Sequence, residues 1–588
     1  MPSITEVTLN LGDVWRFDAS GSYSLARGRL LDTDRGFFST VPSTIATLVL
    51  RGDGIPAKGG NLPTRYSATT RTGTPVDVYD GGNYTVNTAT SAQEKNEATN
   101  DALRLNLARD FPGPLPVTVK TGVSRTSTGQ DARRFTKTWD FRPNGAADLT
   151  SRLAGRFDVF DEAFNAVAPT LYGKPVRWIS SAKTYDVYRQ HPDWFVLQLP
   201  GEYQNLVNNS RKFSETVSAA YVRTDLRLLQ NRLWLVTGVR LEKTEVEGWG
   251  PLSDVFAIYQ RNASGAFVRD AAGQRILITT DALARAKLQF KERGAHAEND
   301  YSGYYPSLNA TYNLSANLLL RVAYARTVGR PNVSFIVPGT TISDPEATSP
   351  TITVNNTALK PWTANSYDLS LESYFLKGGF GSIGVFQKNI KDFFGSVRTR
   401  ATPELLELHG LTDDPAYLAY DIVTQANSGD ARVRGVEFSY RQSLTFLPAW
   451  ARGFQIFANA SKLWLDGTRS ADFAGFNPRS LSGGINFVRP RYSIKVNVTD
   501  QAESRRGLVT ASASTPVETY DYLAARRQWG VSAEYSLSKR YSVYLSANDI
   551  GGGTGATLRY APGTPRYSKP VRVQEDVYYT TIGVKGQF

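Results

Sequence analysis

The feature that most constrains the fold is a two-residue alternation of apolar and polar side chains. In YSIKVNVT (492–499), aromatic and aliphatic residues take one set of alternate positions, and Ser, Lys, Asn and Thr take the other. The same alternation recurs in YDLSLESYF (367–375), VEFSYRQSLTF (436–446) and WGVSAEYSLS (529–538). A period of two is that of a β-strand, so each segment is predicted to have one apolar face and one polar face.

The lengths of the connections separate two kinds of β protein. A soluble sandwich also alternates, with its apolar face turned to the core. Here, however, the polar faces carry full charges, and short and long connections follow one another. The short connections are 315–317, 377–379, 489–491 and 538–540, and the long ones run near 29–100, 129–210, 249–297, 329–362 and 398–430. This pattern is typical of an outer-membrane barrel, with short periplasmic turns and long outer loops. We therefore predict an all-β, transmembrane, antiparallel β-barrel.

The alternation predicts about 17 strands. They fall near 3–11, 13–28, 101–110, 115–127, 211–229, 231–246, 298–313, 317–328, 363–376, 379–397, 431–446, 452–465, 479–489, 490–500, 526–537, 541–550 and 578–588. Intact single-chain barrels usually have an even number of strands. We expect either that one strand is missed or that the chain lacks its front.

The amino-acid composition limits the surroundings and partners that the chain can have. The chain has no cysteine, which excludes disulfides and thiolate metal sites. Its net charge of +13 suits an anionic surface such as lipopolysaccharide or phospholipid heads. Nucleic acid is disfavoured as a partner, because there is no dense basic run and no reader motif. The sequence has no run of about 18 consecutive apolar residues, so no membrane-spanning helix is predicted. The first residues, MPSITEVTLN, carry no visible signal peptide.

The last segment, YYTTIGVKGQF (578–588), alternates and ends on a bare aromatic residue. It reads as the closing strand of the barrel, and it resembles the C-terminal signal that the barrel assembly machinery reads. The residues assigned to this membrane-assembly signal are Tyr578, Ile582, Val584, Gly586 and Phe588. We therefore expect that machinery to be a partner.

Three stretches in the second half of the chain carry a family resemblance. They are ARTVGRPNVSFIVPG (325–339), the segment 356–394 and NSGDARVRGVEFSYRQSLTFLP (427–448). Together they resemble the TonB-dependent receptors. The motif residues are Gly329, Arg330, Pro331, Leu359, Lys360, Pro361, Asp368, Glu372, Phe386, Gly435 and Glu437.

The resemblance implies a 22-stranded outer-membrane barrel with an N-terminal plug inside it. Such receptors bind a scarce nutrient, often a ferric siderophore, cobalamin or a glycan, and a TonB box in the plug couples them to the TonB complex. No plug or TonB box is recognised in residues 1–588, and five further strands would complete the 22. We therefore expect an N-terminally truncated barrel domain that does not transport alone. The alternatives are a passive porin-like channel and a non-functional receptor fragment.

Other motifs favour no second function. GFGSIG (379–384) matches a dinucleotide-binding pattern, but it is expected in a tight turn that leads into a strand, without the following helix that this pattern requires. His191, His296 and His409 all fall in predicted loops and are more simply solvated than ligating. Asp32 and Asp34 could help to bind calcium, yet no complete loop motif surrounds them. We predict no enzyme activity, cofactor or metal site.

The sequence does not decide the role of two further groups of residues. The lumen charges Arg321, Glu372, Lys495 and Glu534 could line a substrate path, but they are expected to solvate the lumen or pair with the plug. The aromatic residues of segment 170–200 could stack on a ligand or pack on one another. These are Trp178, Tyr185, Tyr188 and Trp194. The substrate itself is not readable from the sequence.

Overall fold

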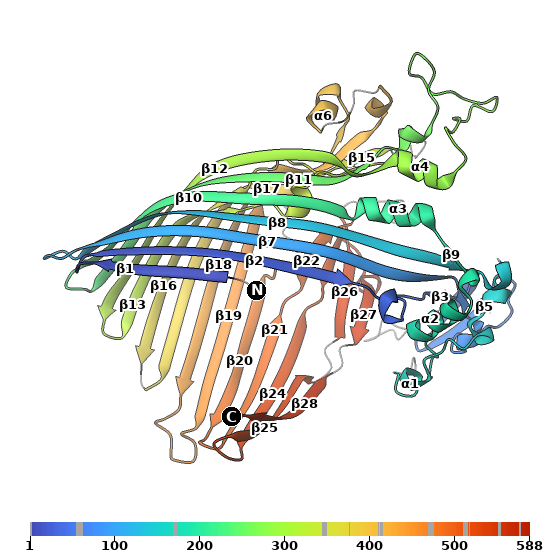
Figure 1. Cartoon of the computed structure of the whole chain (residues 1–588). Coiled ribbons are helices and arrows are strands. Elements are labelled where there is room, and N and C mark those ends of the chain that lie inside the picture. The colour runs from blue at the N-terminus through green and yellow to red at the C-terminus, as the bar shows by residue number, and fades with distance from the viewer. Residues whose placement is uncertain are drawn as a thin grey trace.

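In the part of the chain that the computed structural model describes, seventeen long antiparallel strands form one continuous curved sheet (Figure 1). The structure describes residues 3–54, 63–146, 148–168, 174–343, 350–375, 377–409, 411, 415–467, 476–509, 515–516, 518–550, 554–575 and 578–587. The long strands are β1 (Ser3–Leu11), β2 (Trp15–Leu30), β7 (Thr88–Phe111), β8 (Val117–Phe141), β10 (Ser210–Leu228), β11 (Leu233–Ser253), β12 (Phe290–Ser315), β13 (Leu318–Gly329), β16 (Trp362–Phe375), β17 (Gly379–Arg400), β18 (Asp421–Ser443), β19 (Phe454–Gly467), β20 (Arg479–Val488), β21 (Tyr492–Gln501), β24 (Arg526–Ser536), β25 (Tyr541–Ile550) and β28 (Tyr579–Gly586). All of the predicted strands are confirmed.

Each long strand pairs with the next one along the chain. The sheet curves from β1 round to β28 (Figure 1). Within the described residues, β1 pairs only with β2 and β28 pairs only with β25, so these two strands form the edges of the sheet. Short strands extend the sheet on the side where the long connections leave the long strands. They are β9 (Phe195–Leu197), β14 (Thr340–Ile342) and β15 (Thr351–Val354).

Several strands run farther than the alternation predicted. β7 begins at Thr88 rather than near 101, and β8 ends at Phe141 rather than near 127. β12 and β18 likewise begin earlier than expected, at Phe290 and Asp421. The backbone ladder continues through these extensions, but there the side chains no longer alternate between an apolar lipid-facing side and a polar side, and the buried residues Trp139, Phe141 and Ile422 pack into the cores of the long connections instead. Alternation therefore marks only the part of a strand that has one apolar face.

The outer face of the sheet carries a band of exposed apolar side chains, which we call the apolar band. Its exposed residues include Leu103, Leu105, Val123, Val222, Leu241, Tyr304, Val322, Leu369, Ile383, Ile485, Val496 and Ile582. A water-soluble protein rarely exposes so wide an apolar surface, whereas lipid-facing positions of a barrel require one. The sheet therefore has the surface of a transmembrane barrel.

The long connections contain structure that the sequence did not predict. The helices are α1 (Glu162–Asn165), α2 (Ser181–Gln190), α3 (Leu199–Asn208), α4 (Ala282–Gln289), α5 (Val333–Ile336) and α6 (Pro403–Leu408). Small separate sheets pair β3 (Ser43–Thr44) with β6 (Thr85–Val86), and β4 (Leu48–Asp53) with β5 (Arg65–Thr70). A third joins β22 (Ser504–Leu508), β23 (Tyr520–Leu523), β26 (Thr554–Tyr560) and β27 (Pro570–Glu575). No helix in the described part of the chain is both long enough and apolar enough to cross a membrane.

An ion-pair clasp ties β8, β10 and β12 together beyond the apolar band. Arg293 lies at the start of β12 with φ of 53°, and its guanidinium reaches across β10 to both oxygens of Asp131 on β8. Its Nε also donates to Ser210 Oγ over 3.0 Å. Arg133 donates to Glu292 Oε1 over 2.9 Å in the same group. These side chains link strands that are not neighbours in the sheet.

The clasp makes the stability of the folded protein depend on pH. The hydrogen bond from Arg293 holds the pKa of Asp131 below its ordinary range, and the charges of Arg293, Arg133 and Lys212 act in the same direction. Asp131 lies eight residues beyond Val123, which is roughly 26 Å along an extended strand and outside the apolar band. A lowered carboxyl pKa adds stability above the ordinary pKa, and that stability is lost as pH falls through the lowered value.

We expect Asp131→Asn to reduce the free energy of unfolding by about 1 kcal/mol at neutral pH, a modest value because the pair is partly exposed. The difference from wild type should shrink as pH falls below about 4. Thermal unfolding of the refolded protein in detergent, followed by circular dichroism, measures both the loss of stability and its change with pH. Asp158→Asn is the control, since Asp158 pairs with Lys183 but its side chain is 87% exposed. Equal effects of the two variants at every pH would contradict the clasp.

Candidate functional site

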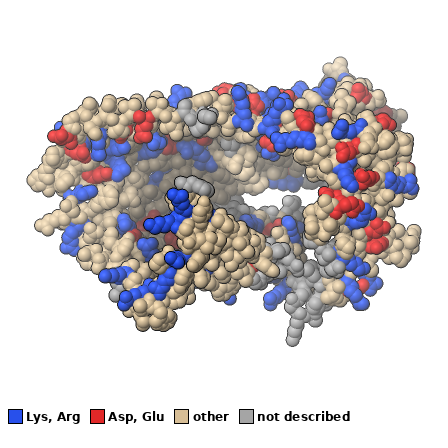
Figure 2. All heavy atoms as spheres, turned by 60° about the horizontal axis from the view of Figure 1, so that its bottom comes forward, with Lys and Arg blue, Asp and Glu red and all other residues tan. Residues whose placement is uncertain are grey.

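The concave face of the sheet carries charged and hydroxyl side chains at the positions that alternate with the apolar band. Figure 2 shows basic and acidic side chains together in the hollowed part of the molecule. Two of the predicted lumen charges form a two-point ion pair, with Arg321 Nε 2.7 Å from Glu372 Oε1 and Nη2 3.3 Å from Oε2. Arg321 also donates to Thr311 Oγ1 over 3.1 Å. The charges of Arg321 and Glu372 are therefore paired with each other on the concave face of the sheet.

The other two predicted lumen charges also have neighbours on the wall. Glu534 accepts hydrogen bonds from Lys585 Nζ at 2.7 Å and Ser542 Oγ at 2.8 Å. The ammonium of Lys495 lies 5.4 Å from the ring centroid of Phe457, a cation–π distance. These contacts are consistent with the structural role that was expected, since they hold neighbouring strands together.

Hydroxyl groups gather on the concave face across β16 to β20, around a hollow of about 410 Å³ that we call the hydroxyl wall. Its polar side chains are Ser370, Glu372, Ser382, Glu437, Ser439, Asn459, Ser461, Ser480 and Ser482. Strand register places them in two rows, because residues opposite each other on paired strands share a face. Such short side chains leave space, and each hydroxyl can both donate and accept a hydrogen bond.

Glu437 differs from the other acidic residue of the hydroxyl wall. Glu372 is held by Arg321, whereas Glu437 has no ion-pair or hydrogen-bond partner within the part of the chain that the structure describes. Its register neighbours are Gly384 and Ser461, which are both small. A free carboxylate therefore faces the hollow with room around it.

Motif residues from distant segments meet where the strands end at the long connections. Arg330 binds Glu242 Oε2 through Nη2 at 2.5 Å, and Glu242 also accepts from Arg240 at 2.5 Å. Gly329 lies against the ring of Trp362, where no Cβ would fit. The Gly329–Pro331 segment, in which Pro331 is buried, is thus fastened to β11 and β16.

A second junction involves Lys360. The side chain of Asn427 donates to the carbonyls of Lys360 at 2.8 Å and Asp392 at 2.7 Å, and its oxygen accepts from the Lys360 amide at 3.0 Å. Asp392 has φ of 60° at an irregularity in the β17–β18 pairing. Asn427 thus supplies hydrogen bonds where the ladder is interrupted.

The remaining motif residues have structural positions. Leu359 is fully buried in a cluster with Val246 and Ile336, and Pro361 follows beside it, half-buried. Asp368 pairs in register with Ala323 and with Phe386. Phe386 lies opposite Gly435, where a Cβ would come within 2.5 Å of Phe386 Cζ and 2.7 Å of Leu463 Cδ2. The glycine is therefore required by the neighbouring aromatic ring.

Ile582, Val584 and Gly586 of the predicted assembly signal lie on the edge strand β28, and Tyr578 directly precedes it. Tyr578, Ile582 and Val584 are exposed, and Gly586 is opposite Tyr541. Ile582 pairs in register with Leu545 on the outer face. Phe588 lies outside the described residues. Recognition by the assembly machinery stays a prediction.

The histidines are distributed over separate environments. His191 stacks on Trp194 with centroids 3.8 Å apart, and His409 ends α6, where burial lowers its pKa. His296 was expected in a loop but lies in β12, because that strand begins at Phe290. It stacks on Trp249, and its ligand atom lies within 4.8 Å of those of Glu247 and Glu298, a set that could hold a metal ion.

Two other motifs have structural explanations. Asp32 is buried and accepts hydrogen bonds from the amides of Thr33 and Ala92 and from the hydroxyl of Ser91. Its oxygens thus anchor the start of the first long connection, whereas Asp34 is exposed. GFGSIG (379–384) opens strand β17 after a turn with φ of 77° at Gly378, as expected. The dinucleotide alternative is thereby excluded.

The loop aromatics mostly pack on one another. Tyr185, Tyr188 and Trp194 surround a core that contains Phe38 and Phe141. The ring of Phe38 is completely buried. The fourth residue, Trp178, is 51% exposed and touches Phe164. Packing therefore accounts for three of these residues.

A sheet of long antiparallel strands, apolar outside and charged inside, defines this molecule as a transmembrane β-barrel domain. The family model described as TonB dependent receptor-like, beta-barrel matches residues 46–550. The chain therefore belongs to the TonB-dependent receptor β-barrel family, whose members are receptors and transporters. No curated protein sequence matches the chain.

Solved structures agree on the fold and differ in cargo. The ferric-catecholate import receptor Fiu from E. coli K12 is 10% identical with a TM-score of 0.52, over 100% of this chain and 64% of that chain. The ferripyoverdine receptor of the outer membrane of Pseudomonas aeruginosa is 11% identical with a TM-score of 0.51, over 100% and 56%. The copper transporter OprC is 11% identical with a TM-score of 0.51, over 100% and 65%. The chain thus spans less than two thirds of their length, and this likeness concerns the fold alone.

The close fit of Gly435 against Phe386 gives a test of the motif. We expect Gly435→Ala to lower the free energy of unfolding by about 1–3 kcal/mol, because the new methyl group collides with the ring. Removing the ring in Gly435→Ala with Phe386→Ala should recover part of that loss relative to the sum of the single variants. Urea unfolding of the four proteins of this cycle measures the coupling. Gly384→Ala is the control, since its Cβ would meet Ser370 at an ordinary 3.7 Å. Strictly additive effects would contradict the packing argument.

Proposed function

We propose that this chain is the barrel part of an outer-membrane receptor for TonB-dependent uptake of a scarce nutrient. The observation that carries the proposal is the family match over residues 46–550. The apolar band and the charged concave face support placement in a membrane. Three similar solved structures are named for a ferric catecholate, a ferric pyoverdine and copper, which favours a metal chelate as cargo. Cobalamin and glycans stay open.

We further propose that other strands and a plug complete the barrel. Lipid does not tolerate unpaired backbone groups, and the described part of the sheet has two such edges, β1 and β28. The family resemblance implies 22 strands, so five would close the gap. The long connections would then face outward, and the TonB box of the plug would bind the TonB complex. Contact with lipopolysaccharide and with the assembly machinery follows from the same placement.

The hydroxyl wall supplies a candidate contact surface for the plug or the cargo. Glu437 is its free carboxylate, so it suits a cationic or hydrogen-bond-donating group that enters the hollow. The paired Glu372 is already neutralised by Arg321 and is less suited to that role.

Uptake in cells distinguishes a coupled receptor from a passive channel. Cells that carry the intact gene should accumulate a labelled ferric siderophore, cobalamin or glycan, and accumulation should fall to the level of the gene deletion when TonB is inactivated. Persistent gene-dependent uptake without TonB would instead identify a passive channel. Absence of any folded product in the outer membrane would identify a non-functional fragment.

We expect Glu437→Gln to reduce that uptake by about fivefold, as for loss of one charge-assisted contact. The amount of protein in the outer membrane should stay the same, because the carboxylate has no partner on the wall. Asp158→Asn, which removes a carboxylate charge from an exposed position away from the hydroxyl wall, is the control. Uptake that is unchanged in Glu437→Gln would exclude the carboxylate from the transport path.

A further inference from the structure

Three metal-ligating side chains meet on β11 and β12, where these strands extend past the apolar band. Glu247 lies on β11, and His296 and Glu298 lie on β12. One ligand atom from each residue lies within 4.8 Å of the ligand atoms of the other two. No other group of three histidine or acidic side chains in the described part of the chain meets this condition. We call these three residues the Glu–His–Glu group.

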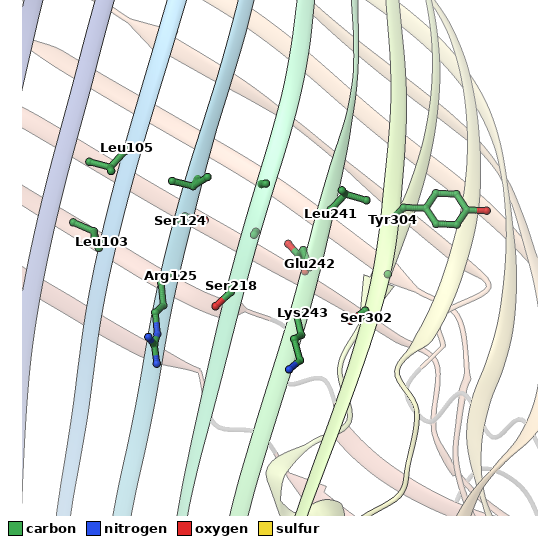
Figure 3. A pocket seen from close by; sticks show the side chains of 14 residues that line it. Leu103, Leu105, Ser124, Arg125, Ser218, Leu241, Glu242, Lys243, Ser302 and Tyr304 are labelled. Carbon is green, nitrogen blue, oxygen red and sulfur yellow. The ribbon is translucent and has the colours of Figure 1, made fainter.

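Strand alternation places the Glu–His–Glu group on the outer face of the sheet. Figure 3 shows Leu241 and Lys243 on β11 beside Tyr304 on β12, and Leu241 and Tyr304 are exposed members of the apolar band. Glu247 follows Leu241 by six residues, an even number, so both side chains share that face. Six residues span roughly 20 Å of strand. The group therefore lies beyond the apolar band, on the side of the sheet opposite to the hydroxyl wall.

The distances within the group are close to those that a small metal ion requires. Nε2 of His296 lies 3.2 Å from Glu247 Oε1 and 3.9 Å from Glu298 Oε1. Two ligand atoms that each bind a tetrahedral zinc ion at about 2.1 Å are about 3.4 Å apart. The imidazole also stacks on Trp249, with ring centroids 4.8 Å apart and planes at 19°. This stacking holds the ring so that one nitrogen faces both carboxylates.

The charges of the group call for a cation. Glu247 and Glu298 are directly opposite each other in the register of β11 and β12, where like charges destabilise a sheet. Neither carboxylate has a lysine or arginine ion-pair partner within the described residues, and both contact His296. Lys243, on the same face, binds Glu245 over 2.8 Å. A protonated imidazole would bring one positive charge against two negative charges, whereas a divalent cation balances both.

We propose that the Glu–His–Glu group binds a divalent transition-metal ion of the Zn²⁺ type. One imidazole nitrogen with carboxylate oxygens suits such ions, whereas calcium and magnesium take oxygen ligands. The three side chains are half-buried or exposed, so water completes the coordination. The ion neutralises the opposed carboxylates and joins β11 to β12 beyond the membrane. The sequence predicted no metal site, since His296 was expected in a loop and its position beside Glu247 depends on the early start of β12.

This ion is a resident part of the protein and not its cargo. The hydroxyl wall lines the concave face of the sheet, whereas the Glu–His–Glu group lies on the outer face. An ion bound there is separated from the lumen by the sheet itself. The site therefore goes beyond the proposed function, and binding of the ion requires neither the plug nor TonB.

Isothermal titration of Zn²⁺ into the untagged, metal-free full-length protein in detergent tests the site. We expect one ion per chain. His296→Ala and Glu298→Gln should each weaken binding by at least about tenfold, because removal of even a supporting partner of a metal ligand costs that much. His191→Ala is the matched control and should leave binding unchanged. His191 also stacks on a tryptophan, Trp194, but it belongs to no group of three ligands in the part of the chain that the structure describes.

Co²⁺ reports on the ligands themselves. The protein with Co²⁺ should show visible absorption that Zn²⁺ removes by displacement and that is absent in His296→Ala. Equal Zn²⁺ affinity of wild type, His296→Ala and Glu298→Gln would overturn the proposal, and so would a wild type that binds no Zn²⁺. Circular dichroism verifies that each variant keeps its strands. Failure of the proposed function has a different signature, since uptake would then be independent of TonB while Zn²⁺ binding through His296 persisted.

Discussion

The whole structure depends on the requirement that backbone amide and carbonyl groups within lipid be paired by other strands. Each long strand meets this requirement through two neighbours, except at β1 and β28 in the described part of the chain. Side chains then have only two directions available, outward to lipid or inward to the concave face. The apolar band, the hydroxyl wall and the Glu–His–Glu group are all results of this one restriction. Even the motif residues act mainly by closing places where the ladder is irregular.

Position, rather than residue type, therefore decides what a charge does here. Glu372 and Glu437 project from neighbouring positions of the same wall, yet one has an arginine on the next strand and the other has only small residues. Asn427 is a similar case, since its side-chain amide supplies hydrogen bonds at the irregularity in the β17–β18 pairing. Such differences come from register, which is set by the pairing of strands far apart in sequence.

Much of the barrel could be predicted from the sequence, because a strand with one apolar, lipid-facing side and one polar, concave side has side chains that alternate with a period of two residues. YSIKVNVT (492–499) and YDLSLESYF (367–375) needed no other information. The extensions of β7 and β8 were missed because most of their residues are polar, and the few apolar ones, such as Trp139 and Phe141, pack into the loop core without a regular two-residue period. The helices of the connections are short and stabilised by tertiary contacts. For the site, the motif residues were found by resemblance. The pairing of Arg330 with Glu242 and the unpaired state of Glu437 depend on strand register and could not be predicted from the sequence.

The length of β8 has a consequence for how far the molecule extends beyond the lipid. Its 25 residues correspond to roughly 80 Å of extended chain, against a hydrocarbon core of about 30 Å. Even with the tilt of a barrel, about half of this strand stands clear of the hydrocarbon core. The packed aromatic core around Phe38 is therefore carried on a stiff stalk, and not on a flexible tether. In the orientation proposed above, large molecules in the medium would meet this rigid segment before they meet the membrane.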